Sequence, residues 1–570
     1  MENSPMSLQQ CCGKYLVTKI ELFCVQEQGT DSWRLAPNVV SLPPTICEFL
    51  LWCWQSEYWK IPDNNFLSIF KDTARTKLRV VFLQGILLSN EDLKILLGHK
   101  VEQLYLINCW KISQEVLEEI LRCKSLRVLE IVEFPYLPYA DKFPIRISIS
   151  QHLEKLVIRN RCVQVESPET NESYLLRHFE CGPVDISTIL RLSPSIKNLT
   201  VLRLQNVGGS QNTISTILEM KSLVDLDISV FYPDHIEIYE DPLEVLQKLV
   251  ENLKNLVRLN VSGTNLLQPT DENAAFTTRM DNPFDFVGIY GTPLDTNRSR
   301  GHLIPAREVA GSASEEEFVT TMETYKSISV TSYLVIKDYK TFLKRNSIVD
   351  VRKVFGTIMG TMGIQSMNYE YQLEGIDVLS EISSRGKLTS EDQLLMTQFL
   401  LEVMELVLYW WQCRNNAACE KMCKKACRVI RELMGSNTDL AIPYHLLLGF
   451  LLPRINHSIC REPLLELLHC IVSGSLGEEE KEIVGIQHGA IEILLEGIRL
   501  FGDDESWEIL GVLTDKAPNN CKKFIESVGE EFIKDQLENK DIITSDSPMT
   551  RVLENVTRVE ELECDHLETS

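Results

Sequence analysis

The chain has 570 residues, of which 44% are hydrophobic and 24% are charged, and its formal net charge is −24. This length and composition support several hydrophobic cores, which excludes a disordered tail protein. The acidic balance argues against nucleic-acid binding, because phosphates are bound by clustered lysine and arginine. The start is not leader-like and no run of about 18 apolar residues occurs, so we expect no membrane contact and a cytoplasmic, or also nuclear, location.

A short apolar stripe opens the chain, in the segment SLQQCCGKYL at residues 7–16. Leu8, Cys12 and Leu16 are four residues apart, which places them on one narrow face of a helix. No core precedes this segment. The face therefore needs a cover, which the rest of the chain or a partner protein must supply.

A second helix with the same spacing is predicted at LPPTICEFL, residues 42–50. Leu42, Ile46 and Leu50 form its stripe. Pro43 and the proline after it suit the first turn, where a missing N–H costs nothing. A purely structural interpretation stays open for both helices, since the terminal repeats of a solenoid need covers.

Leucine-type repeats follow the two helices. The pattern apolar-x-x-apolar-x-apolar occurs eight times, with steps of 23, 25, 27, 23, 23, 24 and 33 residues between the middle positions. All steps but the last fit a leucine-rich-repeat solenoid, and the last indicates an insertion. A further turn at Phe284 and Phe286 is expected to close the array. The triplets are Leu78/Val81/Leu83, Val101/Leu104/Leu106, Leu126/Leu129/Ile131, Leu153/Leu156/Ile158, Leu176/Phe179/Cys181, Leu199/Leu202/Leu204, Leu223/Leu226/Ile228 and Leu256/Leu259/Val261.

The period becomes helical after a polar stretch rich in proline and glycine. Ser314 and Glu317 form a capping box that predicts a helix start. The segment GIQHGAIEILLEGI resembles the opening of an armadillo-type repeat, with Gly489 as a helix break and Ile491, Leu494 and Leu495 facing the stack. We therefore expect an α/β leucine-rich-repeat solenoid followed by an all-α armadillo-like solenoid.

The seventeen cysteines lack a CxxC pair and read as reduced, mostly buried thiols. Cys419, Cys423 and Cys427 have a spacing that one helix could use for metal ligation. Met422, Ala426, Ile430 and Leu433 continue the same stripe, which favours core packing.

Catalytic motifs are not found. The glycines between Gly356 and Gly363 lack the Lys-Ser/Thr of a phosphate loop, and close helix packing in a core is the favoured interpretation. Neither G-x-S-x-G nor H-E-x-x-H occurs, although distant residues could still converge on an active site. We expect no cofactor and no metal.

The two amino-terminal helices carry a resemblance to known motifs. The first is similar to the elongin-binding box and the second to the cullin-2 box, in the expected order. With leucine-rich and armadillo repeats behind them, they resemble the Zyg-eleven/Zer-one family of substrate receptors for cullin-2 RING ubiquitin ligases. The segments FVGIYGT at 286–292 and LTDKAPNNCKKFIESVGEEFI at 513–533 also resemble family segments. The matching positions are Ser7, Leu8, Cys12 and Leu16 for elongin, and Leu42, Pro43, Ile46 and Leu50 for cullin-2.

This resemblance implies a non-catalytic receptor subunit that binds elongin C/elongin B, cullin-2 and protein substrates. Helix-in-groove binding would insert the Leu8 stripe into elongin C. The alternative is a non-degradative leucine-rich/armadillo scaffold that binds protein partners without assembling a ligase. Co-purification of elongins and cullin-2 separates the two hypotheses.

The resemblance also implies a substrate pocket, in which the family motif Trp-Asn-Leu-Thr-Asp recognises an amino-terminal glycine. Asp515 matches the final residue, but Gly511 and Val512 stand at the Trp and Asn positions. Trp507, one turn earlier, could replace the missing ring or lie in the core. Trp507 and Asp515 are thus the candidate pocket residues, and a divergent receptor with another substrate is expected.

The predicted organisation has four parts. Residues 1–60 hold the two box helices, 61–300 the leucine-rich repeats and 301–536 the armadillo-like repeats. Residues 537–570 are acidic and expected to be flexible.

Overall fold

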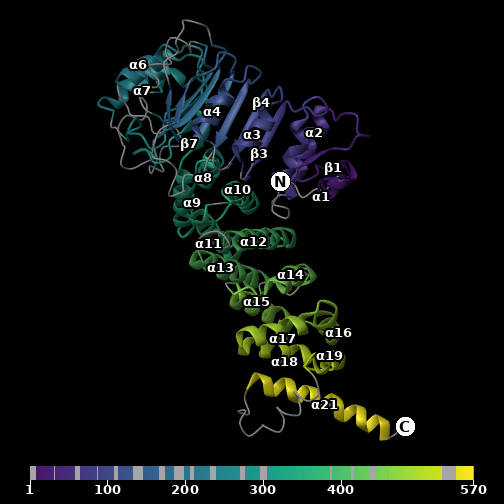
Figure 1. Cartoon of the computed structure of the whole chain (residues 1–570). Coiled ribbons are helices and arrows are strands. Elements are labelled where there is room, and N and C mark those ends of the chain that lie inside the picture. The colour runs from purple at the N-terminus through teal and green to yellow at the C-terminus, as the bar shows by residue number, and fades with distance from the viewer. Residues whose placement is uncertain are drawn as a thin grey trace. The chain divides into compact units, whose positions relative to one another are not determined.

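The computed structural model divides the chain into two compact units, which are described separately (Figure 1). The first is Met1–Phe342 with Gly363–Asn368, and the second is Leu343–Met362 with Tyr369–Ser570. The residues described are 8–30, 32–57, 64–86, 88–107, 109, 113–132, 145–165, 174–184, 198–205, 211–231, 239–269, 276–295, 304–366, 368–385, 388–411, 416–435, 444–458, 460–474, 476–528 and 547–568.

One long sheet of 11 strands forms the frame of the first unit, with each repeat adding a parallel strand (Figure 1). Its main path follows chain order from β3 to β13, and β6 pairs with β7 off this path. The strands are β3 (Val80–Gln84), β4 (Gln103–Ile107), β5 (Val128–Val132), β6 (Ile145–Ile147), β7 (Lys155–Val165), β8 (His178–Val184), β9 (Val201–Leu204), β10 (Asp225–Asp227), β11 (Arg258–Asn260), β12 (Phe284–Gly288) and β13 (Ala306–Ala310).

The register of this sheet confirms the predicted repeats. The middle residues of the eight triplets are paired from strand to strand, beginning with Val81 beside Leu104. All 24 triplet residues are buried. Alternate strand residues point to one face, so the apolar spacing alone selects the face that forms the core.

The closing turn differs from the expectation. Val287, not Phe286, pairs with Leu259 in the line of middle residues. The triplet is therefore Phe284/Val287/Ile289, all fully buried. Phe286 points to the opposite face, where its ring lies under the Arg258 guanidinium at 4.3 Å. The sheet then continues to β13, past residue 300, where the sequence predicted helical repeats to begin.

Helices flank the strands of the first unit. Ser314 is the N-cap of α8, and its hydroxyl accepts a hydrogen bond from Glu317 N as predicted. The Glu317 carboxylate bonds to Ala313 N, so the capping box reaches one residue further back than the standard motif. The elements are α1 (Leu8–Thr18), η1 (Ile20–Leu22), β1 (Cys24–Gln26), β2 (Trp33–Leu35), α2 (Pro44–Glu57), η2 (Asn64–Lys71), α3 (Asn90–Leu97), α4 (Gln114–Leu121), α6 (Gln211–Leu218), α7 (Pro242–Asn252), η5 (Thr277–Arg279), α8 (Glu315–Tyr325) and α9 (Ser329–Leu343).

The second unit is an all-α solenoid. Gly489 has a φ of +68° at the start of α17, which is the predicted helix break, and Ile491, Leu494 and Leu495 are buried as expected. The helices are α10 (Val351–Ile364), α11 (Tyr369–Arg385), α12 (Ser390–Trp411), α13 (Asn416–Gly435), α14 (Tyr444–Leu451), η7 (Leu452–Arg454), α15 (Arg461–Gly474), α16 (Glu478–Glu482), η8 (Ile483–Gln487), α17 (Ala490–Phe501), α18 (Asp504–Thr514), α19 (Pro518–Val528) and α21 (Pro548–Glu568).

The glycine run contradicts its expected role in core packing. Gly356, Gly360 and Gly363 lie on the exposed side of α10, and a Cβ added at any of them would meet no heavy atom within 4 Å. The core side of α10 is formed by other residues of the helix, including Phe355 and Ile358. Spacing identified the shared helix face, but it could not identify which face is covered.

The cysteine stripe of α13 is core, as predicted. Cys419, Cys423 and Cys427 are all buried. The Cys423 Sγ lies 2.9 Å from the Sγ of Cys460, the residue before α15. Burial raises the pKa of the Cys427 thiol, which keeps this sulfur neutral and poorly suited to bind a metal.

The carboxy-terminal segment is not wholly flexible, which corrects a prediction. Residues 548–568 form α21, and Val552, Leu553 and Val556 are buried. The Asn555 side chain donates to Gly511 O at 3.0 Å and to Thr514 Oγ1 at 3.1 Å, which joins α21 to α18. The sequence did not indicate this helix, because only its inner face is apolar and the segment as a whole is acidic.

Candidate functional site

The predicted elongin-binding stripe lies on α1. Cys12 is exposed, whereas Leu16 is half-buried and packs against the core of the first unit. Leu8 is the first residue of the helix, but its side chain lies outside the described residues, as does Ser7. The described part of the stripe is therefore open at its middle position.

A close helix contact holds α1 against α2. Gly13 is buried, and a Cβ at this position would lie 2.5 Å from both Cys53 Sγ and the Phe49 ring. Any larger residue would force the two helices apart. The absence of a side chain at position 13 thus fixes which side of α1 faces the protein and leaves the neighbouring Cys12 outward.

The α2 helix covers the edge of the sheet. The Glu48 carboxylate accepts hydrogen bonds from the backbone N–H groups of Arg79 and Val80, at 3.0 and 2.9 Å. Gln55 Oε1 accepts another from Gln84 N at 2.7 Å. Three otherwise unpaired donors of the edge strand are thereby satisfied. The structural interpretation of this segment, a cover for the first repeat, is correct for α2.

The predicted cullin-binding stripe is only partly available. Leu50 is 3% exposed and belongs to the core, so it presents no surface to a partner, which corrects its assignment. Leu42 is half-buried against the same core and precedes the helix. Pro43 is exposed, and Ile46 is 39% exposed.

Two exposed aromatic residues lie on α1 and α2 outside the predicted stripes. Tyr15 on α1 is 58% exposed, and Trp52 on α2 is 41% exposed and stacks on Phe49 at 6.1 Å between ring centroids. Aromatic residues are enriched in protein interfaces. Neither residue continues the four-residue spacing of the predicted stripes. Only the way each helix packs shows that these two side chains face outward.

The candidate pocket residues of the second unit, Trp507 and Asp515, have different surroundings. Trp507 is half-buried and its ring packs edge-on against Phe524 of α19, at 6.3 Å. Asp515 ends α18, and its carboxylate makes no hydrogen bond or ion pair with the residues that the structure describes. The Arg551 Cδ would lie 3.3 Å from a Cβ at Gly511, so α21 occupies the space that a larger side chain there would need.

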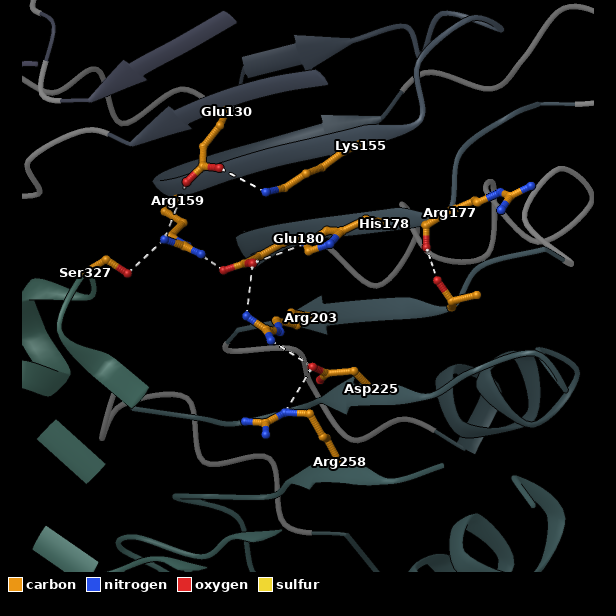
Figure 2. Close-up of polar contacts among 11 residues, drawn as sticks. Glu130, Lys155, Arg159, Arg177, His178, Glu180, Arg203, Asp225, Arg258 and Ser327 are labelled. Atoms are coloured by element: carbon orange, nitrogen blue, oxygen red, sulfur yellow. Dashed lines mark hydrogen bonds and ion pairs between the residues drawn. The ribbon is translucent and has the colours of Figure 1, made fainter. Parts of the chain in front are cut away.

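A ladder of alternating charges runs along the sheet face opposite the apolar triplets (Figure 2). Arg159 donates to Glu180 and to Ser327 Oγ, and the Glu130 carboxylate lies 3.8 Å from it. Arg203 bonds Asp225 Oδ2 at 2.7 Å, and the same oxygen lies 3.4 Å from Arg258 Nε. We call this set the charge ladder: Glu130, Lys155, Arg159, Glu180, Arg203, Asp225 and Arg258.

The ladder borders a pocket of about 290 Å³, whose other wall is the end of α8 and the turn between α8 and α9. Burial alone would raise the pKa of the Glu180 carboxyl, but His178 and Arg159 hold it below its usual range. Glu180 therefore stays ionised at neutral pH, and each cation of the ladder keeps a fixed counterion. No local sequence pattern marks this ladder, because its members come from repeats more than 20 residues apart.

Asp227 lies beside the ladder under α8. Its carboxylate accepts bonds from Ser229 N and from Asn260 Nδ2, both at 2.9 Å. The Tyr325 hydroxyl of α8 donates to Asn260 Oδ1 at 2.8 Å. Burial raises the pKa of Asp227 to about 6. This buried network joins the sheet to the first helix that follows it.

The described residues hold no group of three or more metal-ligating side chains arranged for an ion. Among them, too, no helix has the length and apolarity needed to cross a membrane.

A parallel sheet of leucine-type repeats, followed by a helical solenoid, defines a repeat protein of the leucine-rich class. The family model "Zer-1-like, Leucine-rich repeats" matches residues 176–292. The Protein zer-1 homolog of Drosophila melanogaster is 24% identical, over 93% of this chain and 71% of its own length. The Protein zer-1 homolog of Homo sapiens is 22% identical, over 98% of this chain and 78% of its own length. The Zyg eleven-related protein 1 of Caenorhabditis elegans is 23% identical, over 65% of this chain and 43% of its own length.

Over most of its length the chain is therefore similar to members of the Zyg-eleven/Zer-1 family. No solved structure matches it significantly.

Proposed function

We propose that this protein is the substrate-recognition subunit of a cullin-2/elongin B–C RING ubiquitin ligase. It would bind protein substrates and present them for ubiquitination, without catalysing a reaction itself. The observation that carries this proposal is the exposure of Cys12 in the middle of a box-like stripe, on a helix held outside the repeats of a chain similar to Zyg-eleven/Zer-1 family members.

The chemistry of α1 supports elongin C as the partner of this face. A small thiol at Cys12 permits a partner helix or groove to approach closely, and exposed Tyr15 adds apolar area beside it. On α2, the exposed Ile46 and Trp52 provide the apolar surface for cullin-2. The buried Leu50 makes no direct contact in this proposal; it holds α2 on the sheet.

Replacing Cys12 with Asp is expected to weaken elongin B/C binding by on the order of a hundredfold, because a carboxylate would be desolvated in an apolar groove. Purified full-length protein and elongin B/C are compared by biolayer interferometry. Cys11→Asp is the matched control, because Cys11 is also exposed on α1 but lies outside the stripe. Equal binding by folded Cys12→Asp protein would disprove the elongin assignment.

Replacing Ile46 with Asp is expected to reduce cullin-2 capture by about tenfold or more while elongin B/C stays bound, because the two boxes contact different proteins. Thr45→Asp adds the same charge at the neighbouring exposed position and serves as control. The measurement is co-precipitation of each partner with the full chain. Unchanged cullin-2 capture would leave α2 with its covering role alone.

The second candidate function is a repeat scaffold that assembles no ligase. The hydrogen bonds that Glu48 and Gln55 accept from backbone N–H groups at the sheet edge favour it, since they give α2 a structural role that needs no partner. Absence of both elongins and cullin-2 from purified complexes would establish this alternative.

A further inference from the structure

The charge ladder presents its cations outward and its anions inward. The Arg258 and Arg203 side chains are 37% and 32% exposed, whereas their partner Asp225 is 12% exposed. Lys155 is likewise more exposed than Glu130, and Arg159 more than Glu180. Solvent therefore meets mainly N–H donors along this face, and the ladder has four cations for three carboxylates because Arg203 and Arg258 share Asp225.

Arg258 has unused hydrogen-bonding capacity. Its only ion-pair contact within the described residues is Nε to Asp225 Oδ2 at 3.4 Å, and no hydrogen bond joins its other two nitrogens to these residues. Figure 2 shows those nitrogens directed away from Asp225. The Phe286 ring, 4.3 Å from the guanidinium, supports it from one side. A guanidinium held in this way offers two parallel donors at little entropic cost.

The pocket beside these residues has room for a ligand. Its volume of about 290 Å³ is many times the roughly 10–15 Å³ that a single water molecule needs. Ile328, from the turn between α8 and α9, adds an apolar side chain to its wall, whereas Lys326 of the same turn is paired with Glu323 of α8 at 3.1 Å. Together with Arg258, this wall suits a short polypeptide stretch that carries a carboxylate next to an apolar residue.

We propose that this pocket binds an acidic peptide segment of a partner protein, with a carboxylate held by the free nitrogens of Arg258 and by Arg203. Bidentate guanidinium–carboxylate bonds are strong and directional, and the buried Asp225 and Glu180 hold the donors in place beforehand. That the partner is a ligase substrate rests on the proposed function; the binding of an acidic peptide does not.

Nucleic acid is the less suitable anion for this surface. Its repeated phosphates need free cations along an extended path, whereas each cation of the ladder already has a carboxylate partner. The net charge of −24 on the chain also repels a long polyanion. A short segment with one or two carboxylates needs only the exposed guanidinium groups.

The test measures binding of a fluorescein-labelled peptide of alternating aspartate and serine to the full chain by fluorescence anisotropy. The asparagine–serine peptide of the same length is the neutral comparison. The acidic peptide is expected to bind about tenfold or more tightly than the neutral one, and Arg258→Gln should remove about tenfold of its affinity. Arg307→Gln should change it less than about twofold, because Arg307 pairs with Asp285 outside the pocket.

Three results would overturn the inference: equal binding of the two peptides, no loss in folded Arg258→Gln protein, or equal loss in both variants. Tighter binding of a single-stranded oligonucleotide that depends on Arg258 would also overturn it in favour of a nucleic-acid surface. Elongin B/C binding is measured on the same samples and should be unchanged by Arg258→Gln. If the wild-type chain does not bind elongin B/C, the proposed function is contradicted, but the result with the acidic peptide still holds.

Discussion

Replacing Arg461 with Ala will lower the local unfolding free energy around α15, α17 and α18 by about 3–5 kcal/mol, the typical effect of breaking a buried charge pair. The guanidinium is almost fully buried. It bonds Asp503 Oδ2 through two nitrogens and Ser506 Oγ at 2.9 Å. Asp503 is the N-cap of α18, so the substitution would leave a capping carboxylate without its counterion.

Hydrogen-exchange mass spectrometry on the full chain measures this loss, because peptides from the three helices report local unfolding free energies. Arg431→Ala is the matched control: Arg431 has a single carboxylate partner, Glu466, and both side chains are partly exposed. Its effect should stay below about 1 kcal/mol. A comparable small effect for Arg461→Ala would show that the network contributes little to stability.

Asp227 will make the first unit less stable as the pH rises from about 4 to about 6. Burial raises the pKa of this carboxyl from 3.8 to about 6. Below pH 4 both folded and unfolded states hold the proton. Between the two values only the folded state holds it, so stability is lost as pH rises through the folded pKa and is then constant. The difference of about two pH units corresponds to about 3 kcal/mol at most.

The comparison of wild type with Asp227→Asn isolates this effect, because Glu180, whose pKa is lowered, titrates in the opposite sense. Urea unfolding of the full chain at pH 4 and pH 7 should give a stability difference between the two proteins that changes by up to about 3 kcal/mol. Asp285→Asn, at an exposed ion pair, should show almost no such change. An equal difference at both pH values would contradict the prediction.

The leucine-rich repeats could be predicted because their signal is local and repeated. Each triplet places three apolar residues on one strand face, and the middle residues of all eight are in register in the sheet. The error in the closing turn, where Phe286 was assigned to the core face, also comes from reliance on this local spacing. One extra apolar residue, Phe286, fits the alternation but faces the other side of the sheet, where Arg258 covers it.

The candidate sites were predicted less completely, because spacing identifies a helix face without identifying its neighbour. Leu8, Cys12 and Leu16 share a face, yet only the contact of Gly13 with α2 determines that Cys12 points outward. Leu42, Ile46 and Leu50 also share a helix face, but Leu50 is buried in the core. The charge ladder joins side chains from successive repeats, and no local pattern marks such pairs.

The sequence by itself determined the two kinds of repeat, the helix start at Ser314 and the buried cysteine stripe of α13, since each depends on the periodicity of one segment. The tertiary structure alone decided that α21 covers Gly511, that the glycines of α10 face outward, and that Arg203 and Arg258 share Asp225. The physical reason is that burial and ion pairing belong to pairs of surfaces, and the second surface comes from a distant part of the chain.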